Sequence, residues 1–323
     1  MQKFIVFGFA IVAVGSLGLG IFFMYSEPKH IPMQALSERS LPVPSNQNHQ
    51  QEFSRPPVQV NNTLTQTGVS SASNEAETIE QYTLDDSVST LSNPQKIPTI
   101  DGQEYFIVGL PKAHTSKSPR KIIFSLPGHG STAEQDFEAW KPQIVDKDYA
   151  LASLNWWHGG GEKITDYYAP DAVLAQIKGF LETYGYTDAD FVVLEGFSRG
   201  SANTYPVKAY DMTSGTQVID AVISASGKYQ SDFPLTPEQT KYHNGKLYAG
   251  VPWILACGEK DPNPTRDGCE GMNETKDYLT SQGAFVLRVL SDPNGGHGAF
   301  HKSSRNLASQ ALGLLDDFLS TQK

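Results

Sequence analysis

The sequence predicts an α/β fold, in which helices cover both faces of a mostly parallel β-sheet. Strand-like apolar runs recur through residues 96–323, with helical segments between them. This alternation favours a parallel sheet, because parallel strands need crossover connections and these are usually helices. Several runs are continuously apolar, which is typical of strands that are covered on both faces. One of them leads directly into the pattern Gly-x-Ser-x-Gly.

The expected strands and helices follow one another along this part of the chain without an internal repeat. The strands are expected at Glu104–Leu110, Lys121–Leu126, Tyr149–Trp157, Phe191–Glu195, Ala221–Ser226, Val251–Cys257 and Ala284–Ser291. The clearest helix covers residues 170–184, whose apolar residues repeat at helical spacing between Pro170 near the start and Gly185 just past the end. A second amphipathic helix presents apolar residues on one face from Leu307 to Phe318.

An apolar segment opens the chain. Residues 4–25 carry no charge, and as a helix they would cover about 33 Å, which is enough to span a bilayer. Because Lys3 precedes them, residues 1–25 are predicted to form a single-pass membrane anchor with a cytoplasmic N-terminus. A cleaved secretory signal, which would leave the protein secreted, is the alternative. In both cases we expect the rest of the chain outside the cytoplasm, in a periplasm or at the cell surface.

The remaining composition separates a linker from one globular domain. Residues 26–95 are rich in Ser, Thr, Gln, Asn and Pro, so they are predicted to be a disordered linker. Residues 96–323 are long enough for a single core. The formal net charge of -10 and the lack of a basic stripe argue against a nucleic-acid partner. Cys257 and Cys269 are the only cysteines. Outside the cytoplasm we expect a disulfide between them, with two separate buried thiols as the alternative.

The segment Gly196–Gly200 carries the strongest functional signal. A Gly-x-Ser-x-Gly turn between a strand and a helix holds its serine in a strained backbone conformation and lifts the hydroxyl off the sheet edge. Glycines are needed at both ends, because side chains there would collide where the strand folds back against the helix. Ser198 is therefore a candidate nucleophile, and the helix beginning at Arg199 aims its first N–H groups at it. Pro206 should kink or shorten this helix.

A nucleophilic serine needs a base within hydrogen-bond reach, and the base needs a carboxylate that orients it. Asp261 follows the sixth expected strand and His297 follows the seventh. Both are therefore expected at the carboxyl edge of the sheet, where α/β folds place their sites. Glu259 and Asp267 are the alternative acids, and His301 is the alternative base.

Two backbone N–H donors should stabilise the negative oxygen of the reaction intermediate. One is expected from Arg199, directly after the serine. The other is expected from the glycine-containing loop after Lys121–Leu126, with the His129 N–H preferred and the Gly128 N–H as the alternative. The His129 ring is interpreted as positional, because no spacing of Cys, His or acidic residues indicates a metal site. We expect no cofactor.

These motifs, in this order, resemble the α/β-hydrolase superfamily over about residues 100–320. Within it the chain is similar to exported esterases related to polyhydroxyalkanoate depolymerases, feruloyl esterases and acetyl xylan esterases. Those esterases usually carry His-Gly after the oxyanion strand, where this chain has Pro127-Gly128. The resemblance implies an α/β-hydrolase catalytic domain that cleaves carboxylic esters through an acyl-enzyme.

The substrate is less well indicated. Trp156 and Trp157 follow a strand and precede a glycine run, so they are candidates for stacking on a sugar or an aromatic acyl group. Covering the core is their alternative role. The stretch 227–250 allows a small cap at most, which suits polymeric or saccharide-linked esters. A serine peptidase or other acyl hydrolase on the same triad is one alternative function. A non-catalytic surface binding module on a hydrolase scaffold is the other.

Overall fold

A computed structural model describes most of the predicted domain. The described residues are 91–111, 121–160, 163–185, 190–215, 217–230 and 246–322. The chain divides into two units after Ser73, and all of these residues belong to the second unit. The predicted anchor at 1–25, the linker up to residue 90 and most of the predicted cap region, 231–245, lie outside the described residues. Within the described ranges, no helix has the length and apolar character that crossing a membrane requires.

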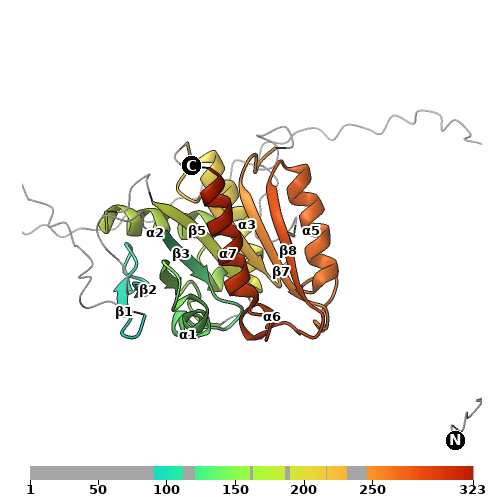
Figure 1. Cartoon of the computed structure of the whole chain (residues 1–323). Helices are drawn as coiled ribbons and strands as arrows, with labels where there is room; N and C mark the ends of the chain where they lie inside the picture. Colours follow the sequence, from blue (N-terminus) through green and yellow to red (C-terminus); the bar gives the residue numbers. More distant parts are fainter. Residues whose placement is uncertain are drawn as a thin grey trace, which may run out of the picture. The chain divides into compact units, whose positions relative to one another are not determined.

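The described strands form one eight-stranded sheet (Figure 1). They are β1 (Gln95–Pro98), β2 (Tyr105–Gly109), β3 (Lys121–Leu126), β4 (Ala150–Leu154), β5 (Phe191–Phe197), β6 (Ala221–Ala225), β7 (Pro252–Gly258) and β8 (Phe285–Asp292). Their spatial order is β1-β2-β4-β3-β5-β6-β7-β8. The pairs β1–β2 and β2–β4 are antiparallel, and all pairs from β4 to β8 are parallel. The predicted mostly parallel sheet is therefore present.

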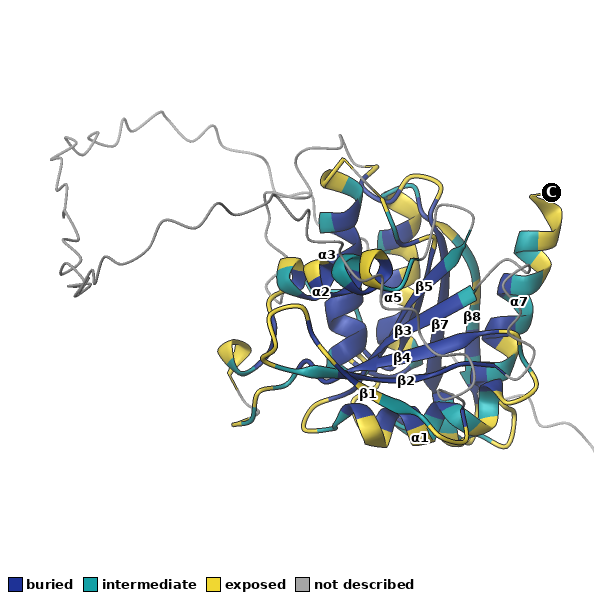
Figure 2. Cartoon of the chain, turned by 90° about the vertical axis from the view of Figure 1, so that its left-hand side faces the viewer, coloured by how far each residue is buried: buried dark blue, intermediate teal, exposed yellow. Residues whose placement is uncertain are grey.

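Helices cover both faces of this sheet. One face packs against α1 (Ala133–Ile144), α6 (Ala299–Lys302) and α7 (Leu307–Thr321), and the other against α2 (Pro170–Thr183), α3 (Arg199–Thr213) and α5 (Cys269–Ser281). A short 3₁₀ turn, η1 (Ile164–Asp166), precedes α2. Along β3, Ile122 and Phe124 face one core whereas Ile123 faces the other, which explains the continuous apolar runs. Figure 2 shows the buried strands between helices whose outer faces are exposed.

Two differences from the sequence-based expectations have clear physical causes. The domain starts earlier than residue 96, because Leu91 is buried and its N–H donates to the Leu110 carbonyl at 3.2 Å. Helix α3 runs unbroken through Pro206, so the expected shortening is wrong. Tyr205 and Val207 on either side of the proline are fully buried, and their packing outweighs the one backbone hydrogen bond that proline removes.

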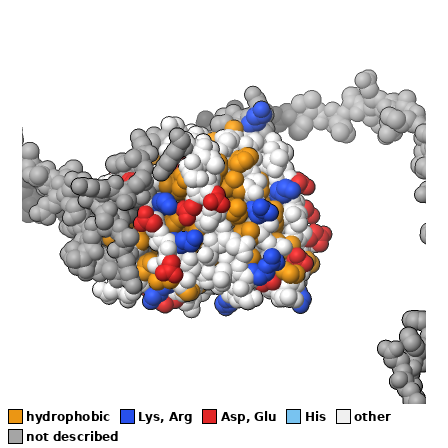
Figure 3. All heavy atoms as spheres, in the orientation of Figure 1, with side chains coloured by type: hydrophobic (Ala, Val, Ile, Leu, Met, Phe, Trp, Pro, Cys, Tyr) orange, Lys and Arg blue, Asp and Glu red, His pale blue; other side chains and the backbone are white. Residues whose placement is uncertain are grey.

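The surface carries both signs of charge. On the face that Figure 3 shows, acidic and basic side chains are interspersed and separated by apolar and uncharged ones. No continuous basic stripe crosses this face.

Candidate active site

Ser198 is the single residue between strand β5 and helix α3. Its backbone has φ 55° and ψ −114°, a strained conformation for a residue with a side chain. A Cβ at Gly196 would overlap the backbone of Gly200, and one at Gly200 would overlap the Leu126 carbonyl. The Ser198 N–H donates to the Ala225 carbonyl at 2.8 Å, which fixes the turn to the next strand. The strained serine turn expected from the sequence is present.

Ser198, His297 and Asp261 form one hydrogen-bonded chain. The His297 Nε2 atom lies 2.8 Å from Ser198 Oγ, and its Nδ1 atom lies 2.8 Å from Asp261 Oδ2. The second Asp261 oxygen accepts the Asn263 N–H at 2.8 Å. The Asp261 side chain is 0% exposed, and that of His297 is 34% exposed. The buried carboxylate can therefore hold the imidazole with Nε2 turned toward the serine hydroxyl.

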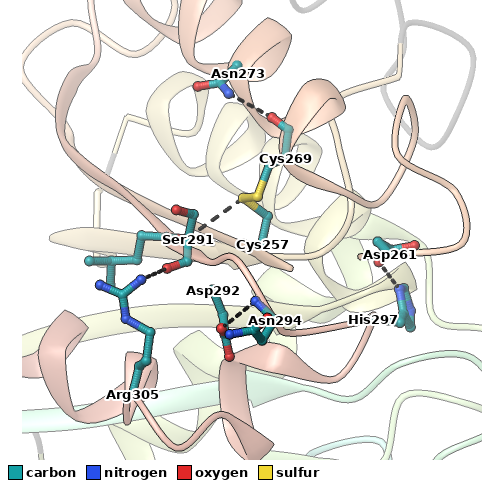
Figure 4. The surroundings of a disulfide bond; sticks show 10 residues. Cys257, Asp261, Cys269, Asn273, Ser291, Asp292, Asn294, His297 and Arg305 are labelled. Atoms are coloured by element: carbon teal, nitrogen blue, oxygen red, sulfur yellow. Dashed lines mark hydrogen bonds and ion pairs between the residues drawn. A yellow bond between two sulfur atoms is a disulfide. The ribbon is translucent and has the colours of Figure 1, made fainter. Parts of the chain in front are cut away.

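Asp261 and His297, on the loops after β7 and β8, point toward one another (Figure 4). The Lys260 N–H donates to the Gly295 carbonyl at 2.9 Å, so the loop after β7 contacts the loop after β8. A disulfide joins Cys257 at the end of β7 to Cys269 at the start of α5, as the sequence predicts. It closes the loop that contains Asp261, and so limits the movement of that carboxylate.

The alternative acids and base occupy other positions. Glu259 is exposed on its loop. One carboxylate oxygen of Asp267, one of Asp261 and a ring nitrogen of His297 lie within 4.8 Å of one another. The Oδ2 atom of Asp267, however, accepts two hydrogen bonds from Arg266. His301 lies in α6, and its ring packs edge-on against Trp140 on the face of the sheet that α1, α6 and α7 cover. The geometry thus favours Asp261 and His297 over these alternatives.

The loop after β3 also lies close to Ser198. A Cβ at Gly128 would lie 3.2 Å from that of Ser198, so only a glycine allows this close approach without displacement. The Tyr167 hydroxyl lies 3.1 Å from the His129 Nδ1 atom and holds this ring in place. Arg199, the first residue of α3, stacks its guanidinium 4.8 Å from the centre of the Tyr167 ring. These contacts place both segments from which the oxyanion donors are expected beside Ser198.

A cavity of about 470 Å³ opens at Ser198. Its lining residues are His129, Ser198, Arg199, Ala202, Gly227, Gln230, Arg266 and Asp267. Neither predicted tryptophan lines it. Trp156 is 1% exposed and donates its indole N–H to the Pro127 carbonyl at 3.0 Å, and Trp157 is half-buried with its indole N–H enclosed. Their position favours the alternative role of covering the core.

Two buried acids beneath the serine turn were not predicted from the sequence. Ser125 Oγ lies 2.5 Å from Asp136 Oδ2 and 2.6 Å from Glu195 Oε2. Ser153 donates to the same Asp136 oxygen at 2.6 Å, and Trp140 donates to the same Glu195 oxygen at 3.0 Å. Burial raises the pKa of Asp136 above its ordinary value. Burial, and then the charge of Asp136, raise the pKa of Glu195 well above its ordinary value.

His301 lies next to this acid pair. A ring nitrogen of His301 and one oxygen of each acid lie within 4.8 Å of one another, a spacing that one cation could bridge. One oxygen of each acid is already hydrogen-bonded to Ser125, and burial lowers the pKa of His301 to about 3. The surrounding hydrogen bonds therefore fit two acids that share a proton beside an uncharged His301 ring. That the site needs no cofactor stays a prediction.

Comparisons with known proteins find similarity in structure alone. No protein-family model matches the sequence, and no curated protein matches it either. An esterase from Pyrobaculum calidifontis has a TM-score of 0.53 at 12% identity, over 70% of this chain and 85% of its own. A thermophilic esterase from Thermogutta terrifontis has a TM-score of 0.50 at 15% identity, over 74% and 94%. TT1662 from Thermus thermophilus has a TM-score of 0.50 at 16% identity, over 70% and 98%.

These similarities agree with the sheet order and with the serine turn between β5 and α3. The chain therefore has the α/β-hydrolase fold. Because all of these identities are low, the similarity extends to the fold and leaves the activity to the argument from the site.

Proposed function

We propose that the chain is a serine hydrolase that cleaves carboxylic esters through an acyl-enzyme. The unbroken hydrogen-bonded chain from Asp261 through His297 to Ser198 carries this proposal. The three residues come from loops after different strands, and a hydrogen-bonded relay of this kind has no simple role in packing. The expected chain order of serine, acid and histidine also supports it.

The proposed reaction follows from this geometry. As Ser198 Oγ attacks the ester carbon, its proton passes to His297 Nε2, and Asp261 stabilises the resulting imidazolium. The N–H of Arg199 and that of His129, or alternatively Gly128, stabilise the negative oxygen of the tetrahedral intermediate. His297 then gives its proton to the departing alcohol, which leaves an acyl-serine. A water molecule attacks this acyl group and gives a proton to His297. As the bond from the acyl carbon to Ser198 Oγ breaks, His297 returns this proton to Oγ, which releases the carboxylic acid and restores the serine hydroxyl.

The place of action is a further part of this proposal. The apolar segment 1–25 is proposed to anchor the chain in a membrane as a single pass, and residues 26–90 to serve as a linker. The catalytic domain would then act in a periplasm or at the cell surface, and a secreted form would follow if the apolar segment were cleaved. The disulfide between Cys257 and Cys269 supports an oxidising compartment. We propose polymeric or saccharide-linked esters among the substrates.

Labelling by a fluorophosphonate probe tests the nucleophile on the full-length chain. The probe should label the wild type, and Ser198→Ala should abolish labelling because the reactive hydroxyl is gone. Ser281→Ala, which removes an exposed serine at the end of α5, is the matched control and should label normally. Undiminished labelling of Ser198→Ala would remove this residue from the proposed role.

Two acid variants test the orienting carboxylate. Asp261→Asn should lower kcat by a factor of the order of 10³ to 10⁴, because an amide does not stabilise the imidazolium. Asp267→Asn should lower kcat far less.

Activity on p-nitrophenyl esters, acetylated xylan, feruloylated sugars, polyhydroxybutyrate and peptide amides then defines the substrate. Ready amide cleavage without a preference for esters would favour a peptidase instead.

A further inference from the structure

Two arginines line the cavity that opens at Ser198. Arg199 and Arg266 both contribute to its wall, and Asp267 is the one acidic lining residue among the described residues. We infer that this cavity selects esters that carry a carboxylate or a similar anionic group, and that Arg266 is the residue that binds this group. The inference rests on the proposed ester hydrolysis and names the substrate class of the same site.

Arg266 is held in place by a buried partner. Its Nε and Nη2 atoms donate to Asp267 Oδ2 at 2.9 and 2.6 Å, and the Asp267 side chain is 7% exposed. The backbone is fixed as well, because the Arg266 N–H donates to the Asn263 carbonyl and the Arg266 carbonyl accepts the Lys228 N–H. An arginine that is fixed before binding loses little conformational freedom when a ligand arrives. It therefore suits recognition better than a mobile surface arginine does.

Part of the Arg266 guanidinium stays available. The Arg266 side chain is 59% exposed, although its carboxylate partner is almost fully buried. Within the described part of the chain, its Nη1 atom has no hydrogen-bond partner. An arginine has five N–H donors in a planar fork, a geometry that matches a carboxylate. The two N–H groups on Nη1 can thus bind an anionic group while Nε and Nη2 keep their bonds to Asp267.

The charged side chains that line the cavity favour an anion as well. Arg199 adds a second positive charge to the lining, and its guanidinium is fixed over the Tyr167 ring. The lining therefore carries two positive charges and one negative charge, although the whole chain has a formal net charge of -10. A local excess of positive charge in a cavity attracts anionic ligands and repels cationic ones.

Arg266 has a rival role as a counter-ion only. Asp267 lies close to Asp261 and His297, so Arg266 could serve only to neutralise this second carboxylate beside the triad. In that case its loss would slow neutral and anionic esters by the same factor. If Arg266 binds the substrate, its loss should slow anionic esters more than neutral ones. This difference separates the two roles.

Matched ester pairs provide the test on the full-length chain. One pair carries the charge on the acyl side, mono-4-nitrophenyl succinate against 4-nitrophenyl butyrate. The other carries it on the alcohol side, 4-(butyryloxy)benzoate against its methyl ester. The wild type should show a higher kcat/KM for the anionic member of at least one pair, and that pair tells which side of the ester faces Arg266. Added salt should reduce this preference, because part of the guanidinium is exposed.

Two variants assign the preference to Arg266. Arg266→Gln should lower the preference by roughly five- to tenfold, as expected for a partly exposed charged hydrogen bond. Arg266→Lys should retain part of it. Arg288→Gln removes the same charge from an exposed site on β8 and should leave the ratio unchanged.

The results separate failure of this inference from failure of the proposed function. If both members of each pair are hydrolysed equally well, or Arg266→Gln and Arg288→Gln shift the ratio alike, the inference is wrong and ester hydrolysis stands. If no ester is hydrolysed and the fluorophosphonate probe fails to label Ser198, the proposed function fails and the inference falls with it.

Discussion

A proton count at Ser125 determines the charge of the two buried acids beneath Ser198. The serine hydroxyl has one proton, yet its oxygen is within hydrogen-bond distance of a carboxyl oxygen from both Asp136 and Glu195. One of these carboxyl groups must supply the second proton. Burial and the neighbouring Asp136 raise the pKa of Glu195 well above its ordinary value, so we assign the proton to Glu195. The pair then carries at most one negative charge.

This assignment predicts a pH dependence of stability. The pKa of Glu195 is 4.5 in the unfolded chain and higher in the fold, so the folded state binds the extra proton. Its contribution to stability is complete below pH 4.5 and is lost as the pH rises through the folded pKa, at up to about 1.4 kcal/mol per pH unit. Glu195→Gln keeps the shape and supplies an N–H donor without titrating. Urea unfolding should therefore show Glu195→Gln gaining on the wild type as the pH increases.

Glu182→Gln is the control for this experiment. Glu182 is exposed on α2, so its replacement removes a carboxylate without touching the buried pair. The difference from the wild type should then stay constant between pH 5 and pH 8. A Glu195→Gln difference that is equally flat over this range would show that Glu195 is ionised in the fold and that the proton assignment is wrong.

Individual residues differ in how far the sequence reveals their roles. The proximity of Ser198, Asp261 and His297 could be predicted because each lies in the turn or loop after a strand, and parallel strands bring their carboxyl ends to one edge. Glu195 is visible as the one charge within an apolar strand. Its pairing with Asp136 is not visible, because nothing local indicates which helix faces β5. The cavity role of Arg266 likewise depends on a fold of the loop that the sequence does not reveal.

At the scale of elements, strands with long apolar runs were predicted better than short or exposed ones. All seven expected strands are present, with limits that differ by a few residues. Strand β1 was missed because it has only four residues, of which Ile97 alone is buried. Its pairing and that of β2 are antiparallel, a feature that the pattern of a single strand does not show. Helix α3 shows the opposite error, because the sequence predicts a shortening at Pro206 that the structure does not have. Packing of the residues around the proline outweighs the backbone hydrogen bond that it removes.

The loop between β7 and α5 gives the prediction at this scale. It carries Asp261 and Arg266, and the disulfide between Cys257 and Cys269 closes it across a separation of 12 residues. Replacing both cysteines by alanine should lower the free energy of unfolding by about 3 kcal/mol. It should also lower kcat, because a looser loop holds the Asp261 carboxylate less firmly against His297. Denaturant unfolding and ester kinetics measure the two effects.

Reduction of the wild type is the companion measurement. A reductant should lower activity in the wild type and leave the double alanine variant unaffected. Mass spectrometry of the alkylated protein reports whether the two thiols were paired beforehand. Full activity in the double variant would mean that the other contacts of the loop, such as the bond from Lys260 to Gly295, are sufficient to hold Asp261.

At the scale of the whole molecule, the residue at which the folded domain begins determines how much of the N-terminal segment a protease can remove without unfolding the domain. Leu91 and β1 are part of the domain, and Lys96 is paired opposite Ile107 with its ammonium 3.2 Å from the Tyr105 ring centre. In the proposed linker, Lys29 and Arg39 are the basic residues that no proline follows. Trypsin added to the outer side of membranes should therefore cut after these two and spare the bond after Lys96.

Such cleavage should release an active domain from the membrane. If residues 1–25 are an anchor, the uncut chain should sediment with membranes, and released protein should begin at Ser40, as N-terminal mass spectrometry would show. The double variant Lys29→Gln, Arg39→Gln should stay membrane-bound under the same treatment, because the anchor then remains attached. Protein that is already soluble before trypsin, with an N-terminus between residues 18 and 30, would identify a cleaved secretory signal instead.

Rapid cleavage after Lys96 would contradict the placement of β1 in the sheet. A protease binds its substrate as an extended, unpaired segment, and a hydrogen-bonded strand is not available in this form.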